Sequence, residues 1–312
     1  MGTANRVQSI NLHMIWSSCM ICNDCPRRCG AERNNDTASG ICRCALLPKI
    51  ARAAPHFGEE PCISGSRGSG TVFFSGCNLR CCFCQNAEIS RGGVGRTVSV
   101  ERLSDIFLEL QDTGVHNISL VTASHYVRAA ARALELAKLR VPVVWNSSGY
   151  DSLESLRMLD GLVQIYMPDM KYIFSDAARL YSAAPDYPEV AKTAIAEMYR
   201  QVGDFVLDGD GMLQSGVLIR HLILPENEEN SRGVIDYVAD TYPGKRVLFS
   251  LMSQFTPMPG TERFPELQRG VGRIMNARLC DYMVERGIIY GYTQEPDSSG
   301  SAMIPEFDLR GT

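Results

Sequence analysis

The chain has 312 residues, of which 45% are hydrophobic and 21% charged, and its formal net charge is −4. This length and apolar content suit one large α/β domain with a small appendage. The mildly acidic balance gives no reason to expect binding to nucleic acid or to an anionic membrane. No apolar run is long enough for a membrane span, and residues 1–16 lack the features of a secretory signal, so we expect a cytoplasmic protein.

The cysteines are concentrated in the first third of the chain. Eleven of the twelve fall between Cys19 and Cys84. A disulfide framework is typical of small secreted proteins, so metal-binding thiolates in a reducing cytoplasm are the better interpretation here. We therefore divide the chain into an extension, a Cys-rich metal-binding segment, a main α/β domain and a tail, at residues 1–16, 17–66, 67–295 and 296–312.

The Cys-rich segment has few periodic apolar residues and is hard to fold without a cross-link or a metal. Four of its thiolates can close one site, either a second [4Fe-4S] cluster or an all-cysteine zinc site, and the spacing leaves both open. The expected ligands are Cys22, Cys25, Cys29 and Cys42, with Cys19, Cys44 and Cys62 as alternatives for one of them.

From residue 70 onward, short apolar strands alternate with amphipathic helices. Strands are predicted at 71–75, 117–122, 141–145, 162–167, 217–224, 247–252 and 288–292. Helices are predicted at 101–112, 126–139, 153–159, 189–202, 231–240 with Ser231 as its N-cap, and 271–286 before Gly287. Six clear βα steps are too few for a closed eight-stranded barrel, so we predict a partial (β/α)6 TIM-like barrel.

Three cysteines follow the first of these strands on one short loop. Cys77, Cys81 and Cys84 have the spacing C-x3-C-x2-C. Three thiolates can hold three irons of a [4Fe-4S] cluster and leave the fourth iron open, as a working site requires. A structural zinc or a chance group of thiols is the alternative. Cys82 is expected to be a bystander, and Cys280 to pack in the core.

Polar residues stand at the ends of the other predicted strands, where the chemistry of such barrels is found. Asp169 and Lys171 share one face of an extended segment, as a structural ion pair or as a substrate-facing pair. Arg220 and His221 are neighbours within an apolar strand and must point to opposite faces. A buried arginine there needs an acidic partner, either from a ligand or from the protein. Asn146, Ser147 and Asp169 could each serve as a helix cap or turn former, and this interpretation is about as well supported as a functional role.

Together these motifs resemble the radical S-adenosylmethionine (SAM) superfamily and, within it, the PflX-type group, whose members resemble pyruvate formate-lyase activating enzymes. The resemblance runs from about residue 19 to 292. It includes Cys22-x2-Cys-Pro-Arg-x-Cys-Gly30, His56-Phe-Gly-Glu-Glu-Pro61, Asn146-Ser-Ser-Gly-Tyr150, Pro168-Asp-Met-Lys171 and Arg220-His-Leu-Ile-Leu-Pro225.

This resemblance implies a radical SAM fold in which Cys77, Cys81 and Cys84 hold the [4Fe-4S] cluster and SAM binds its open iron. Asp169, Lys171 and Arg220 resemble catalytic elements of glycyl-radical activating enzymes. The stretch 122–125 stands where relatives have Gly-Gly-Glu, so its role rests on position alone. The cofactor contacts expected on this basis are Phe83, Asn86, Thr122, Ser124, His125, Asn146, Ser147, Arg220 and His221.

The implied activity is reductive cleavage of SAM to methionine and a 5′-deoxyadenosyl radical, which abstracts a hydrogen atom. A flavodoxin or ferredoxin would supply the electron. The first substrate hypothesis is a backbone glycine of a glycyl-radical enzyme, and the second is a small molecule or another peptide. A third hypothesis is a non-catalytic metal-binding module with the barrel as its scaffold.

Overall fold

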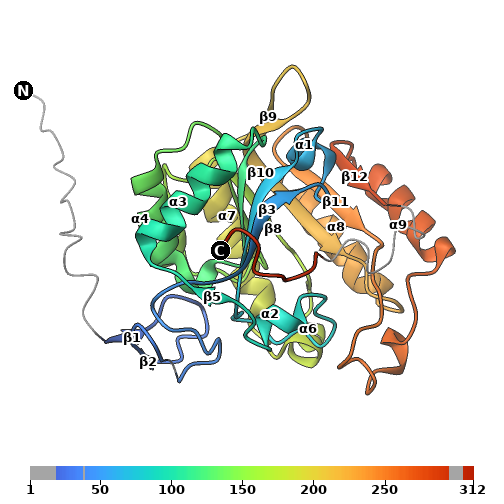
Figure 1. The fold of residues 1–312 in the computed structure, drawn as a ribbon. Coiled ribbons are helices and arrows are strands. Elements are labelled where there is room, and N and C mark those ends of the chain that lie inside the picture. Colours follow the sequence, from blue (N-terminus) through green and yellow to red (C-terminus); the bar gives the residue numbers. More distant parts are fainter. Residues whose placement is uncertain (1–18, 38, 295–304) are drawn as a thin grey trace, which may run out of the picture.

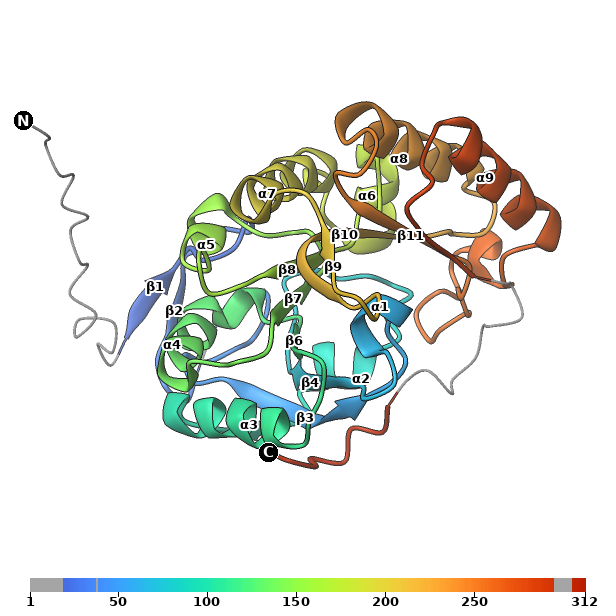
Figure 2. The same ribbon diagram turned by 90° about the horizontal axis from the view of Figure 1, so that it is seen from above.

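The structure is a computed structural model that describes residues 19–37, 39–294 and 305–312 (Figure 1). The expected extension at 1–16 and the first part of the expected tail therefore lie outside the described residues. A curved, mostly parallel sheet organises the chain, with helices on its outer face (Figure 2). The prediction of a partial α/β barrel beside a Cys-rich N-terminal segment is confirmed.

Seven parallel strands form the main sheet of the described part of the chain. In spatial order they are β4 (Ser69–Phe74), β6 (Ile118–Val121), β7 (Val143–Ser147), β8 (Ile165–Pro168), β10 (Leu213–Leu222), β11 (Leu248–Met252) and β12 (Gly291–Thr293). The longer crossover helices are α3 (Val100–Asp112), α4 (Val127–Ala137), α5 (Leu153–Arg157), α6 (Ser175–Ser182), α7 (Tyr187–Val202), α8 (Glu228–Thr241) and α9 (Arg273–Glu285). The short helical turns are α1 (Pro61–Ser64), α2 (Ala87–Ser90), η2 (Ser124–Tyr126) and η3 (Pro265–Leu267).

Three antiparallel strands extend this sheet. β3 (Lys49–His56) pairs with β4, β5 (Arg96–Thr97) with β3, and β9 (Val206–Leu207) with β10. β3 falls within the stretch that the sequence places in the Cys-rich segment, yet it belongs to the main sheet. The sequence analysis missed it because alanine and arginine, which make up most of its middle, are weak strand formers.

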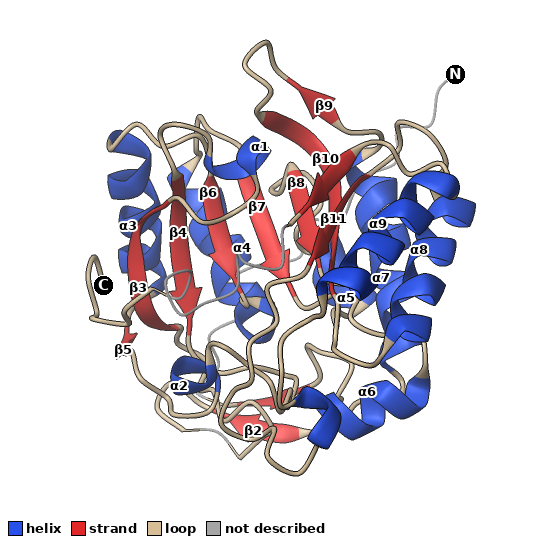
Figure 3. Ribbon diagram, turned by 90° about the vertical axis from the view of Figure 1, so that its right-hand side faces the viewer, coloured by secondary structure: helices blue, strands red, loops and turns tan. Residues whose placement is uncertain are grey.

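The Cys-rich segment forms a hairpin of β1 (Met20–Cys22) and β2 (Ala31–Arg33). The hairpin is hydrogen-bonded to the barrel through Arg27. The Arg27 guanidinium donates to the backbone oxygens of Asn78, at 2.8 Å, and Ala183, at 2.5 Å, and it stacks over the ring of Tyr150. Figure 3 shows the arrowheads of β4, β6 and β7 pointing toward the side where this hairpin lies. The hairpin therefore sits below the carboxyl ends of the parallel strands.

Side-chain alternation divides each strand between two environments. The outward side chains, such as Trp145, Tyr166 and Phe249, are fully buried beneath the helices. The inward ones pack together as the barrel floor and include Val144, Ile165, Met167, Leu218 and Leu248. Toward the carboxyl ends, the next inward positions are polar, which leaves a hydrophilic site above an apolar floor.

Arg220 and His221 point to opposite faces of β10, as expected. His221 is fully buried against α8, where its Nδ1 donates to the Met170 carbonyl oxygen at 2.7 Å and its Nε2 accepts from the Ser231 hydroxyl at 2.9 Å. The prediction of Ser231 as an N-cap is wrong. Helix α8 begins almost a turn earlier, with Glu228 and Glu229 in its first turn, where acidic residues favour the helix dipole.

Membrane insertion was not expected from the sequence. Among the helices that the structure describes, none combines the length and apolar character of a membrane span.

Titration of His221 makes the stability of this strand–helix contact pH-dependent. Burial lowers the pKa of His221 to about 4, whereas an unfolded histidine titrates near 6.5. The unfolded chain therefore binds the proton first, so the contribution is complete above pH 6.5 and is lost progressively toward pH 4. Between pH 7 and pH 5, urea unfolding should show a loss of stability about 2 kcal/mol larger in the unaltered protein than in His221→Gln. Equal losses in both proteins would contradict this assignment.

Candidate active site

A cleft of about 240 Å³ opens at the carboxyl ends of the parallel strands. Most of the site residues expected from the sequence line it, although they come from five separate strands. They are Cys77, Cys81, Phe83, Cys84 and Asn86 after β4, Thr122 after β6, Asn146 and Ser147 at the end of β7, Asp169 and Lys171 after β8, and Arg220 on β10.

The cysteine loop is held in place by close packing around Gly76 and Asn78. Gly76 has a φ of 87°, and a Cβ there would lie 2.1 Å from the Cys44 sulfur, so no larger residue fits. Asn78 is almost fully buried and donates from its side chain to the Tyr150 carbonyl oxygen at 2.8 Å. The Cys-rich segment and the barrel therefore fix the loop from both sides.

The three thiols have surroundings that fit an iron–sulfur cluster. Burial, together with the neighbouring Cys81 and Cys84 thiolates, raises the pKa of Cys77 to about 12. Metal ions supply the positive charge that displaces such protons. Ser182 donates to the Cys81 sulfur at 3.0 Å, and the backbone N–H of Leu79 to the Cys77 sulfur at 3.4 Å. Hydrogen bonds of this kind stabilise thiolates and tune cluster potentials.

Within residues 19–37, 39–294 and 305–312, no three His, Cys, Asp or Glu side chains come together closely enough to hold one metal ion. A [4Fe-4S] cluster does not need such convergence because each thiolate binds a different iron.

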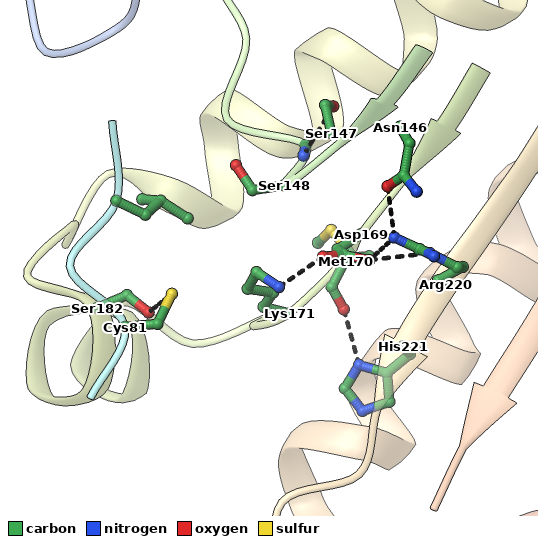
Figure 4. Close-up of polar contacts among 12 residues, drawn as sticks. Cys81, Asn146, Ser147, Ser148, Asp169, Met170, Lys171, Ser182, Arg220 and His221 are labelled. Carbon is green, nitrogen blue, oxygen red and sulfur yellow. Dashed lines mark hydrogen bonds and ion pairs between the residues drawn. The ribbon is translucent and has the colours of Figure 1, made fainter. Parts of the chain in front are cut away.

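Arg220 is the centre of a hydrogen-bonded ion network in the cleft (Figure 4). Its guanidinium is only 14% exposed, and it binds Asp169 at 3.1 Å, Glu59 at 3.0 Å and the Asn146 side-chain oxygen at 2.7 Å. Lys171 binds the other oxygen of Asp169 at 2.5 Å. The acidic partner that the sequence predicts for Arg220 therefore comes from the protein itself.

Glu59 is the functional candidate that the sequence analysis missed. It lies in the loop after β3, lines the cleft, and also accepts from the Asn146 amide at 3.2 Å. Burial raises its pKa to about 7, although the Arg220 charge opposes this shift. The His56–Pro61 motif contained the residue, but β3 was not predicted, so nothing marked Glu59 as lying at a strand end.

Three of the expected cofactor contacts, Ser124, His125 and His221, lie outside this cleft. Both histidines are buried, and Nε2 of His125 bonds to the Ser75 carbonyl oxygen at 2.8 Å beneath the cysteine loop. Burial lowers the pKa of His125 to about 4. Thr122 does reach the cleft, and it has a φ of 60°, which is unfavourable for a β-branched residue and typical of a functional position.

The expected N-terminal ligands surround a second, smaller cavity next to the cysteine loop. Its lining includes Cys22, Cys25, Cys29, Cys42, Arg33, Asn78 and His125. Burial raises the pKa of Cys25 to about 11, whereas a hydrogen bond from Cys44 lowers that of Cys42 to about 6. The buried Arg33 donates to the Cys22 sulfur at 3.4 Å and supplies a compensating positive charge.

The remaining cysteines have other surroundings. Cys44 bonds to the Ser75 carbonyl oxygen, and Cys62 packs in the apolar barrel floor. Cys82 is buried in the core behind the cysteine loop, and Cys280 is partly buried against the same core. Neither Cys62 nor Cys280 is among the described residues that line the two cavities.

Loss of Arg220 should destabilise the fold because it leaves two buried carboxylates without their partner. We expect Arg220→Ala to lower the free energy of unfolding by about 3 kcal/mol, the scale for breaking a buried ion pair. Adding Glu59→Gln to this variant should recover part of the loss, since it removes one uncompensated charge. Denaturant unfolding of the two variants and of Arg220→Lys would measure this, and wild-type stability of Arg220→Ala would refute it.

Comparisons with known proteins find one sequence family and one curated relative that are similar to this chain. Residues 71–196 match the sequence model of the Radical SAM superfamily. The uncharacterized protein MJ0674 of Methanocaldococcus jannaschii is 25% identical over 258 residues, which make up 80% of this chain and 70% of MJ0674.

Two solved structures align with part of this chain. Streptococcus suis SuiB bound to S-adenosylmethionine aligns with a TM-score of 0.45 and 13% identity, over 72% of this chain but only 46% of SuiB. A domain of pyruvate-formate lyase-activating enzyme from Bacteroides vulgatus aligns with a TM-score of 0.36 and 11% identity, over 62% of this chain and 91% of that domain. Residues 71–196 are therefore similar to the Radical SAM superfamily, and that similarity implies a [4Fe-4S] cluster and SAM as cofactors.

Proposed function

We propose that this protein cleaves SAM reductively and abstracts a hydrogen atom from a backbone glycine of a partner polypeptide. The proposal rests on one observation: the same cleft is lined by Cys77, Cys81 and Cys84 and by the Asp169–Lys171 pair and Arg220. The first group fits the cluster. The second resembles the corresponding elements of glycyl-radical activating enzymes.

The bound cluster and SAM supply the chemistry: one electron breaks the sulfonium carbon–sulfur bond and gives methionine and a 5′-deoxyadenosyl radical. The protein holds and orients these groups. Cys77, Cys81 and Cys84 hold the cluster. Phe83 lines the same cleft and is one of the expected contacts of SAM.

The charged residues of the cleft have separate roles in this proposal. Lys171 lies close enough to Cys81 for its positive charge to favour the thiolate. Arg220 is already satisfied by Glu59, Asp169 and Asn146, so it orders the cleft rather than offering a free cation. Asp169 binds both cations and thereby fixes Lys171 relative to the cysteine loop.

Aromatic side chains support the site from behind. Tyr126, Tyr150 and Tyr172 are all buried in the core. Tyr150 and Tyr187 stack with ring centroids 6.0 Å apart, and the Tyr187 hydroxyl donates to the Asp169 carbonyl oxygen at 2.7 Å. These rings exclude water from the back of the cleft and hold the backbone of the catalytic segment.

We propose a flavodoxin or ferredoxin as the electron donor, and a second [4Fe-4S] cluster or a zinc ion at Cys22, Cys25, Cys29 and Cys42. Counting metal after anaerobic reconstitution separates the two alternatives. About eight irons per chain would indicate two clusters, whereas about four irons with one zinc would indicate a zinc site.

Removal of one cluster ligand tests the assignment of the cysteine loop. Cys81→Ala should abolish 5′-deoxyadenosine formation from SAM and dithionite, because one iron loses its thiolate. Cys82→Ala is the matched control, since it removes the adjacent thiol, which packs in the core. Turnover retained by Cys81→Ala, measured by chromatography of the nucleoside, would exclude Cys81 as a ligand.

The identity of the hydrogen donor is tested by isotope transfer. A candidate glycyl-radical enzyme is labelled with deuterated glycine and incubated with the reconstituted protein, SAM and dithionite. We expect deuterium in 5′-deoxyadenosine by mass spectrometry and a protein radical by electron paramagnetic resonance. Nucleoside formed without deuterium in the presence of each such enzyme would exclude glycine as the donor and leave a small molecule or another peptide.

A further inference from the structure

Residues 305–312 lie along the outer edge of β3 (Figures 1 and 2). In the described part of the chain, this edge pairs with another strand only through β5, opposite Lys49 and Ile50. Beyond that point no other strand pairs with this edge, so its outward backbone N–H and C=O groups need another partner. Such an edge is a ready template for another extended chain.

The 305–312 segment satisfies these backbone groups. The Leu309 N–H donates to the Ala51 carbonyl oxygen at 3.2 Å, and the Ala53 N–H donates to the Arg310 carbonyl oxygen at 2.8 Å. Gly311 has a φ of 70°, and a Cβ there would lie 2.2 Å from the Ala53 oxygen. Only glycine therefore allows this close approach. Pro55, two residues after Ala53 on β3, lacks an N–H and so cannot donate a further hydrogen bond along this edge.

Two side chains of the segment are recognised specifically. The Phe307 ring packs edge-on to Phe73, with centroids 5.6 Å apart, and joins a small cluster with Ala51 and Val121. The Asp308 carboxylate binds the Arg52 guanidinium at 2.8 Å, and the same guanidinium donates to the Glu306 carbonyl oxygen at 2.9 Å. The edge thus provides backbone groups, an apolar pocket and a cation.

This edge leads directly into the candidate active site. Pro305 lines the cleft together with Cys81, Cys84 and Lys171, and Phe73 lines it too. A chain that makes the contacts of Phe307 therefore reaches the cleft within two residues.

The segment is held by the kinds of contact that a bound peptide makes. They are two backbone hydrogen bonds to the sheet edge, one ring in a pocket and one ion pair whose Asp308 side chain is 33% exposed. Strand-edge recognition of peptides uses this combination, with affinity from the backbone and specificity from side-chain pockets.

We propose that the edge of β3 is a docking surface for an extended polypeptide with an aromatic residue followed by an acidic one. Residues 305–312 occupy the surface until a substrate polypeptide takes their place and leads its own residues into the cleft. The inference rests on the proposed function in taking the substrate to be a polypeptide.

The test uses a fluorescent synthetic peptide with the sequence of residues 305–312 as the probe. Its binding is measured by anisotropy to the complete chain and to a chain that ends at residue 304. The shortened chain should bind at least tenfold more tightly, because the complete chain carries its own competitor. Peptides with Phe307→Ala or Asp308→Arg should bind the shortened chain at least tenfold more weakly.

A charge exchange checks the register of docking. Arg52→Glu in the shortened chain should reverse the preference, so that the Asp308→Arg peptide binds better than the original. Equal binding of the probe to the complete and shortened chains, or no binding to a folded shortened chain, would overturn the proposal.

If the shortened chain does not fold, Phe307→Ala in the complete chain replaces it. This variant should show faster hydrogen exchange at Ala53 and at least tenfold tighter binding of the probe than the unaltered chain. Unchanged exchange and binding would overturn the proposal. These measurements need no SAM and no reductant, so a negative result would overturn the docking proposal without bearing on SAM cleavage.

Discussion

The buried charge of Arg220 is the constraint on which the cleft depends. Its guanidinium joins β10 to Asp169 after β8, to Asn146 at the end of β7 and to Glu59 in the loop after β3. A cation with so little access to water is stable only with such partners, and the partners are stable only with it. Three parallel strands and one antiparallel strand are therefore fixed relative to each other at the end where the cysteine loop lies.

This ion network also determines which charge lies next to the cysteine loop. Asp169 holds Lys171, and Lys171 favours the thiolate of Cys81, so the ion network on one wall is electrostatically connected to the cysteines on the other. The Cys-rich hairpin supports the same loop from below through Arg27 and Asn78. The barrel and the hairpin thus converge on one short segment, the position at which a bound cluster must be held rigidly.

The sequence predicted most of the parallel sheet and most of the cleft, because both depend on local patterns. Alternating strands, amphipathic helices and the spacing of Cys77, Cys81 and Cys84 are all visible within a few residues. β3 was missed because its alanines and arginine gain strand structure only by pairing with β4. Glu59 was missed with it, and the packing of 305–312 on β3 joins residues about 250 positions apart in the chain. The burial of His125 and His221 depends on which way each side chain points, which a motif does not encode.

Electron paramagnetic resonance of the reduced, reconstituted protein, recorded without and with SAM, tests the central claim most directly. If the three cysteines leave one iron open and the cleft binds SAM there, the spectrum of the reduced cluster should change on addition of SAM. A cluster that forms and is reduced normally but gives the same spectrum with saturating SAM would contradict the account.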